Sequence, residues 1–110
     1  AHSTASDVSR WLRYFVHPDP PVLRAETAAA MITNQNQGLN LPWGLGWKTG
    51  AGRLAKGSSS RTFGHSGSTG TIAWLDPEKD LSLVLLTTKP AAVSQKTLLG
   101  PVSDVVASAA

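Results

Sequence analysis

The chain has 110 residues, of which 41% are hydrophobic and 15% are charged, and its formal net charge at pH 7 is +3. This is the size of one small domain, with too few charges for a disordered chain. The absence of cysteine excludes disulfide frameworks and cysteine-based metal sites, and no apolar run approaches the 18 or so residues that span a membrane.

Two helices are predicted in the first third of the chain. Residues 3–16 carry apolar side chains on one helical face, at Val8, Trp11, Leu12 and Phe15. Thr4 is placed to cap this helix, the proline-rich segment after His17 ends it, and Trp11 is expected in the core. A shorter, alanine-rich helix is expected at about 22–33, anchored by Leu23, Met31 and Ile32.

The middle of the chain is rich in glycine, since nine of the ten glycines lie between Gly38 and Gly70. Such density indicates tight turns or close backbone approach. Residues 43–47 predict a short strand, residues 48–61 a mobile hairpin loop, and residues 62–66 the return strand.

The same region carries charge of one sign. No acidic residue occurs from 27 to 75, whereas four basic residues do: Lys48, Arg53, Lys56 and Arg61. This pattern favours an anionic partner, or else is a solvated basic loop. Nucleic acid is not an expected partner, because the basic residues are dispersed and form no recognition-helix pattern.

A hairpin is predicted next, formed by residues 71–75 and 81–88 around the polar turn 76–80. The second run is almost continuously apolar, which predicts a central strand covered on both faces. Residues 92–109 have helical spacing, interrupted at Gly100-Pro101. Helices, then an antiparallel sheet at about 43–88, then a helix define an α+β fold.

The segment Gly64–Gly70 reads Gly-His-Ser-Gly-Ser-Thr-Gly and holds the strongest candidates for chemistry. A histidine beside hydroxyls can bind an anion or move a proton. The glycines let a substrate lie against the backbone, where N–H groups can stabilise an oxyanion. By composition alone, a histidine in such a turn is more often structural than functional.

The order of motifs around this segment resembles the C-terminal part of the serine β-lactamase, penicillin-binding-protein (DD-peptidase) and esterase superfamily. In that superfamily a strand bearing Lys-Thr-Gly or His-Ser/Thr-Gly lines the catalytic cleft, and a glycine-rich bend, an aromatic strand, an Asp-Pro-Glu-type turn, an apolar strand and a helix follow. The matching pieces here are 44–47, 65–67, 68–70, Trp74, 76–79 and 83–88. The resemblance covers nearly the whole chain and implies a partial β-lactamase/transpeptidase-like fold over residues 1–110.

The resemblance also implies site residues. His65 would take the place of the family's lysine, the Ser66 hydroxyl would bind a substrate carboxylate or carbonyl, and the Ser68 N–H would be one oxyanion donor. Gly67, Thr69 and Trp74 would contact substrate. No cofactor and no metal are implied. Lys48-Thr49-Gly50 spells the family motif literally, but no bend and hairpin follow it, so it is interpreted as the start of a surface loop.

Two family elements are missing from the sequence. No serine is followed three residues later by lysine, and the only tyrosine, Tyr14, lies in the first predicted helix. The chain is therefore expected to be inactive alone, and the segment beginning at Ala1, which has no signal-peptide pattern, is interpreted as a cut into a longer protein.

Three functions remain open on these grounds. The first is the C-terminal part of a serine hydrolase acting on β-lactams, peptidoglycan-like peptides or small esters, with its missing N-terminal part as partner and, by resemblance, an extracytoplasmic location. The second is a non-catalytic domain that binds an anionic ligand. The third is a dimerisation domain that uses an unpaired sheet edge.

Overall fold

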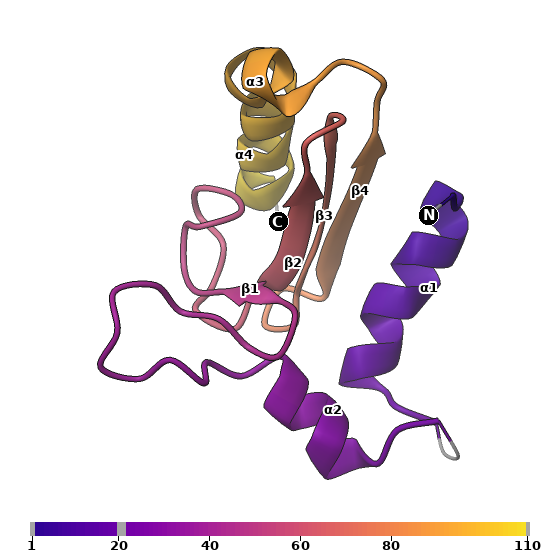
Figure 1. The fold of residues 1–110 in the computed structure, drawn as a ribbon, viewed down its shortest axis with the longest axis vertical. Coiled ribbons are helices and arrows are strands. Elements are labelled where there is room, and N and C mark those ends of the chain that lie inside the picture. Colours follow the sequence, from indigo (N-terminus) through magenta and orange to yellow (C-terminus); the bar gives the residue numbers. More distant parts are fainter. Residues whose placement is uncertain (1, 20–21, 110) are drawn as a thin grey trace.

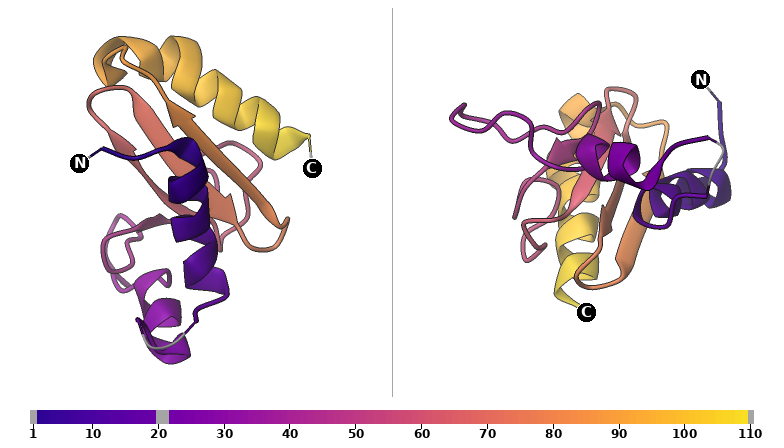
Figure 2. Two further views of the ribbon diagram at one scale, coloured as in Figure 1. Left: turned by 90° about the vertical axis from the view of Figure 1, so that its right-hand side faces the viewer. Right: turned by 90° about the horizontal axis from the view of Figure 1, so that it is seen from below.

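A computed structural model describes residues 2–19 and 22–109, which form three layers (Figure 1). Helices α1 (Ala5–Val16) and α2 (Ala25–Met31) precede an antiparallel sheet whose strands lie in the order β1 (Lys48–Thr49), β2 (Phe63–Gly67), β3 (Thr71–Asp76) and β4 (Leu81–Leu86). The chain ends in α3 (Ala91–Ser94), a π-helical turn η1 (Gln95–Leu99) and α4 (Gly100–Ser108). Figure 2 shows α1 against one face of the sheet and α4 against the other. The predicted α+β class is confirmed.

Helix α1 begins as predicted, because the Asp7 backbone N–H donates to the Thr4 side-chain oxygen at 3.1 Å. Its apolar stripe buries Leu12 and Phe15 completely or nearly so. The prediction that Trp11 lies in the core is wrong, since 47% of this side chain is exposed. Trp11 lies at the margin of the apolar helix face. Its ring stacks on Tyr14 and meets Phe15 edge-on, with 4.7 Å between the Trp11 and Phe15 centroids.

Helix α2 is shorter than predicted and starts at Ala25. The preceding residues are used for docking on α1: Arg24 is extended, and the Leu23 N–H donates to the Tyr14 hydroxyl at 2.9 Å. Leu23, Met31 and Ile32 do pack against the cluster formed by Leu12, Phe15, Ala28, Phe63 and Leu75. This cluster joins both helices to one face of the sheet.

The predicted strand at 43–47 is a turn instead. The Gly44 N–H donates to the Trp47 carbonyl at 2.8 Å, and Gly46 has a φ of +85°, so the chain reverses there. Trp43 forms a single bridge to Lys48, and the strand itself is Lys48–Thr49. The interpretation of Lys48-Thr49-Gly50 as the start of a surface loop is therefore wrong, because this turn puts its first two residues into the sheet.

The segment 50–61, predicted as a mobile loop, is held against the body of the protein. Leu54, Ala55 and Ser58 are buried in it. The Lys56 N–H donates to the Asp104 carboxylate of α4 at 2.8 Å, and Ser59 bonds to Asp76 at the end of β3. By contrast, the segment between α2 and β1 extends away from the sheet (Figure 1) and exposes Leu39 and Leu41.

The β3–β4 hairpin is confirmed, with the register Thr71↔Leu86 through Asp76↔Leu81. However, β4 is an edge strand and not the central strand that its apolar sequence predicts. The apolar run reflects two covered faces: Leu81, Leu83 and Leu85 pack towards α4, whereas Val84 packs towards α1. A strand can thus be covered on both faces of the sheet and still have one edge that is not paired with another strand.

The C-terminal helix runs on through the predicted interruption. Pro101 has no N–H to continue the ladder, and the Gly100 N–H donates to the Gln95 carbonyl five residues back, which widens the helix into a π turn. Leu99, Ser103 and Ala107 are buried beneath it. No helix of the described residues is long and apolar enough to cross a membrane.

Candidate active site on strand β2

Strand β2 carries three of the six predicted site residues, His65, Ser66 and Gly67, along an edge that is largely open. On one side β2 pairs with β3 along its whole length, from Phe63↔Leu75 to Gly67↔Thr71. On the other side β1 pairs only with Phe63 and Gly64. In the described part of the chain, the backbone from His65 to Gly67 therefore has no strand beside it on the β1 side, and an edge of this kind can accept an extended ligand.

His65 and Ser66 point to opposite faces of the sheet, because side chains alternate along a strand. His65 lies opposite Ala73, on the face of α1, and Ser66 lies opposite Ile72, on the face of α4. His65 is exposed, with its Nδ1 2.7 Å from the Ser66 carbonyl oxygen. A carbonyl oxygen only accepts, so Nδ1 is the donor in this contact, and Nε2 is the ring nitrogen left for a ligand.

The bend after β2 is fixed by the end of β4. The Gly70 N–H donates to the Gly67 carbonyl at 3.1 Å, which closes the turn. The Gly70 carbonyl accepts from the Thr87 hydroxyl and N–H, and the Ser68 carbonyl accepts from the Ala91 N–H at 2.9 Å. The Ser68 N–H has no acceptor among the described residues, so it is available to a ligand, as the predicted oxyanion donor requires. Ser68 and Thr69 are both exposed.

Gly70 has two reasons to be glycine. Its φ is +100°, in the region that L side chains rarely adopt. An added Cβ would also overlap the Lys89 carbonyl oxygen and lie 2.6 Å from the Thr87 hydroxyl. The bend therefore has one tightly packed position immediately after Ser68 and Thr69.

Sequence reasoning missed two residues beside this strand. Lys48 on β1 lies on the same face as Ser66, with its Nζ 3.5 Å from the Ser66 Oγ. The Trp43 ring lies 5.7 Å from the His65 ring and carries the Lys48 Nζ at 5.8 Å from its centroid. The literal Lys-Thr-Gly spelling pointed to Lys48, and only the turn at 44–47 explains how it reaches the site.

The predicted contact between Trp74 and substrate is wrong, because the structure buries this residue completely. Its ring lies beneath α4, and the indole N–H donates to the Ser103 hydroxyl at 3.2 Å. Trp74 is two residues from Ile72 and shares its face, so strand alternation directs it into the core.

Asp76 is a buried carboxylate at the far end of β3 from the bend. Burial alone would raise its pKa, but hydrogen bonds from the Ser59 hydroxyl at 2.6 Å, the Ser59 N–H at 2.8 Å and the Glu78 N–H at 3.1 Å lower the pKa of Asp76 below 3.8 overall. It ties the loop 50–61 to the sheet. No three His, Asp or Glu side chains of residues 2–19 and 22–109 come together in a way that could hold a metal ion.

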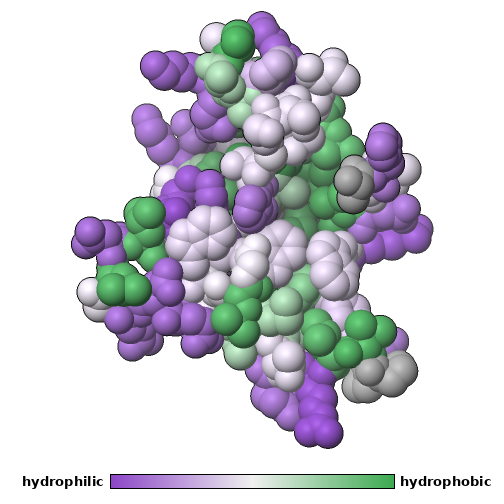
Figure 3. Space-filling model, in the orientation of Figure 1, coloured by the Kyte–Doolittle hydropathy of each residue, from purple (hydrophilic) through white to green (hydrophobic). Residues whose placement is uncertain are grey.

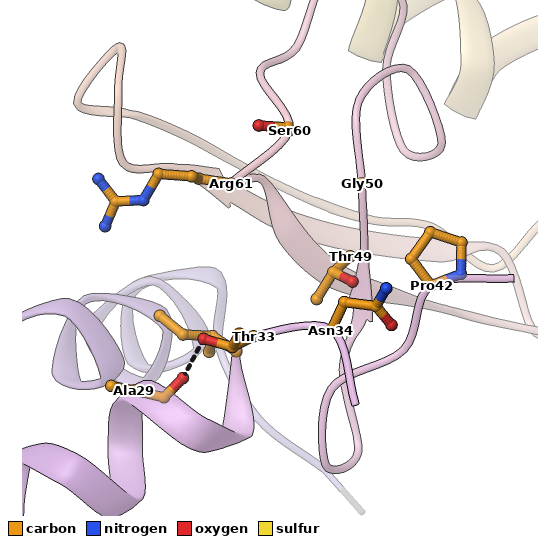
Figure 4. A pocket seen from close by; sticks show the side chains of 9 residues that line it. Ala29, Thr33, Asn34, Pro42, Thr49, Gly50, Ser60 and Arg61 are labelled. Carbon is orange, nitrogen blue, oxygen red and sulfur yellow. Dashed lines mark hydrogen bonds between the residues drawn. The ribbon is translucent and has the colours of Figure 1, made fainter. Parts of the chain in front are cut away.

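A pocket of about 520 Å³ lies on the α2 side of β1, between the end of α2 and the chain at 60–61 (Figure 4). None of the six predicted site residues lines it. Its wall includes Thr49, Asn34 and Arg61, and the Thr49 hydroxyl is buried with no hydrogen-bond partner in the described structure. The pocket is therefore separate from the open edge of β2.

Comparison with known proteins places the chain in a family. The family model described as "Beta-lactamase" matches residues 1–102, and the chain belongs to this family. A crystal structure of a β-lactamase from Mycobacterium bovis superposes with a TM-score of 0.80 at 29% sequence identity, covering 97% of this chain and 44% of that one.

Two curated relatives of the chain come from two strains of one organism. Both are described as "Putative D-alanyl-D-alanine carboxypeptidase", from Escherichia coli K12 and O157:H7. Each is 32% identical over an alignment of 80 residues that covers 66% of this chain. The aligned part is 17% of each relative. The chain thus matches the relatives over a minor part of their length.

Proposed function

We propose that this chain is the C-terminal part of a serine hydrolase that acts through an acyl-enzyme on β-lactam, D-Ala-D-Ala-type peptide or small ester substrates. The single observation that carries the proposal is the open edge of β2, where His65 and Ser66 are followed by an unbonded Ser68 N–H. Membership of the β-lactamase family supports it.

In this proposal the chemistry is divided between two parts of one protein. A serine hydroxyl from the part upstream attacks the substrate carbonyl carbon, and its proton passes through neighbouring bases to the leaving group as the bond to that group breaks. The Ser68 N–H stabilises the oxyanion, Ser66 holds a polar group of the substrate, and the Nε2 lone pair of His65 takes part in the proton network. Water then hydrolyses the ester to the serine.

The remainder of the protein would dock where this chain leaves surface uncovered. β4 has no neighbouring strand on its outer edge among the described residues. Apolar side chains gather at the surface over the upper part of β4, beside α1 (Figure 3), and Leu86 is 43% exposed. An apolar edge of this kind is a template for another strand.

The test is covalent labelling by a fluorescent penicillin or fluorophosphonate. The full-length gene product is expected to be labelled at a Ser-x-x-Lys serine upstream of residue 1, and the 110-residue chain is expected to remain unlabelled. A reading frame without that motif, or a full-length protein that neither reagent labels, contradicts the proposal.

The anion-binding alternative has one observation in its favour, the pocket at Thr49 and Arg61 (Figure 4). It requires a ligand held by the 110-residue chain itself. Chemical-shift changes at Arg61 on titration with phosphate or acetate, in a chain that no acylating reagent labels, would support this function over the hydrolase.

A further inference from the structure

We propose that the loop 34–43 binds the surface of an anionic lipid bilayer, with Leu39 and Leu41 entering the boundary between headgroups and acyl chains. This loop belongs to the segment between α2 and β1 that extends away from the sheet (Figure 1). The proposal gives the chain a second binding surface beside the open edge of β2, and it does not depend on the proposed function.

The tip of the loop is apolar and uncharged. Leu39 is 71% exposed and Leu41 is 56% exposed. No charged residue occurs between Glu26 and Lys48. Figure 3 shows apolar side chains among polar ones on the left of the molecule, where this loop projects. The two leucines can therefore leave water for a bilayer without any charge leaving water with them.

The loop is held in shape by its own hydrogen bonds. The Gln35 N–H donates to the Trp43 carbonyl at 2.7 Å, and the Leu39 N–H donates to the Asn36 carbonyl at 2.9 Å. The Asn36 side-chain amide donates to the Leu41 carbonyl at 3.2 Å. These bonds satisfy backbone groups that would otherwise lose water at a lipid surface, which lowers the cost of burying the tip.

The base of the loop is cationic. The Trp43 ring lies there, with the Lys48 Nζ 5.8 Å and the Arg53 Cζ 5.7 Å from its centroid. Arg53 also donates to the Pro42 carbonyl, which ties its guanidinium to the loop. Neither ion pair among the described residues involves Lys48 or Arg53. An apolar tip above a tryptophan and two cations matches the order of acyl chains, interface and phosphate groups in a bilayer.

The charge around the loop and the small size of its tip favour an anionic membrane as the partner. No acidic residue occurs from 27 to 75, and this part of the chain has four basic residues. Cations near a negatively charged bilayer are attracted to it. A stable protein partner needs a contact of about 20–30 residues a side, whereas a few apolar side chains and cations suffice for reversible binding to lipid.

The test is cosedimentation of the 110-residue chain with vesicles of phosphatidylglycerol and phosphatidylcholine. The chain is expected to bind these vesicles at least about tenfold more tightly than vesicles of phosphatidylcholine alone, because only the former attract the cations. Raising NaCl from about 0.1 M to about 0.5 M should weaken the binding several-fold. Leu39→Ser and Leu41→Ser should each lower the partition coefficient about tenfold, since each removes one apolar side chain from the bilayer.

The matched control is Val105→Ser, which removes an aliphatic side chain that is 70% exposed on α4. It should change the partition coefficient less than about twofold, because it lies outside the inserted loop. Equal binding to both kinds of vesicle, or a loss with Val105→Ser and not with the leucine variants, would overturn the proposal. Light scattering without lipid gives the mass of each variant, and a lower mass for Leu39→Ser would show that the leucines bind a second copy instead.

A fluorescent label can show which part of the chain enters the lipid. The chain has no cysteine, so Gln37→Cys and Val105→Cys each accept a single nitrobenzoxadiazole group. On the mixed vesicles, the emission should shift to the blue at position 37 and stay constant at position 105, because this dye responds to the loss of water. An unchanged emission at position 37 would refute insertion of the loop. These measurements need no turnover, so a failure of acylating reagents to label the full-length protein would contradict the proposed function alone.

Discussion

At the scale of single residues, the site depends on positions where backbone geometry leaves little choice. Gly70 closes the bend after Ser68 and holds a φ that L residues avoid, while its Cα faces the Lys89 carbonyl. The hydrogen bonds of Thr87 and Ala91 to the same bend fix it from the other side. The Ser68 N–H, which is the proposed oxyanion donor, is thus positioned by a bend that packing at Gly70 holds in place.

Gly70→Ala is expected to destabilise the protein by about 3 kcal/mol or more, because strain at positive φ and an overlap with backbone add together. Gly46→Ala is the control, since Gly46 has a φ of +85° and nothing within 4 Å of an added Cβ. It should cost only about 1–2 kcal/mol, the left-handed strain alone. Urea unfolding measures both, and equal losses would show that the Lys89 contact has no effect.

Of the candidate site, the sequence best predicted which residues form the strand and the bend. The segment Gly64–Gly70 forms the expected strand and bend. Trp74 and Lys48 were assigned the wrong environments for different reasons. Trp74 lies on the predicted strand, but its face is covered by α4, which the strand's own sequence does not show. Lys48 was assigned to a loop because no bend and hairpin follow its motif, and because the turn at 44–47 that brings it into the sheet was interpreted as a strand.

At the scale of elements, one buried carboxylate ties the end of the loop 50–61 to the sheet. Asp76 accepts from Ser59 twice and from the Glu78 N–H, and it is completely buried. Local patterns predicted a free loop because they contain no information on a partner 17 residues further on. Long-range polar contacts of this kind are the main feature of the fold that periodicity cannot predict.

Asp76→Asn is expected to destabilise the protein by about 2–4 kcal/mol at pH 7, since an amide would place a donor against the Ser59 N–H. The pKa of Asp76 is lowered by folding, so its stabilisation is fully present above the ordinary value of 3.8 and is lost as the pH falls below it.

The difference in unfolding free energy between wild type and Asp76→Asn should therefore be constant from pH 7 to about pH 5 and shrink below pH 3.8. Urea titrations at pH 7, 5 and 3 test this, with effects of other carboxyl groups cancelling in the difference. A difference that stays constant down to pH 3 would refute the assignment.

At the scale of the whole molecule, one edge of the sheet is short and the other is long. β1 has two residues, whereas β4 has six, without charge or proline. Long apolar edges pair with other chains unless they are covered. The 110-residue chain is therefore expected to self-associate through β4, and the proposed full-length protein is expected to cover that edge internally.

Leu86→Lys should weaken self-association of the 110-residue chain about tenfold or more, because a charge at an edge strand opposes pairing. Val105→Lys is the control, on α4 at 70% exposure and away from the edge. Light scattering after size exclusion measures the mass of each variant. Dissociation by Val105→Lys and not by Leu86→Lys would place the contact on α4 instead.

The alternation of β2 also determines which changes in chain length the protein can accept. Inserting or deleting one residue between 63 and 67 would exchange the faces of His65 and Ser66, and would displace Gly64 from the place where a Cβ cannot fit against Trp74. Residues 37–41, in the segment between α2 and β1 that extends away from the sheet, are exposed, and lengthening the chain there costs little. Variation in loop length is therefore expected around the site, with a constant number of residues within the strand that forms it.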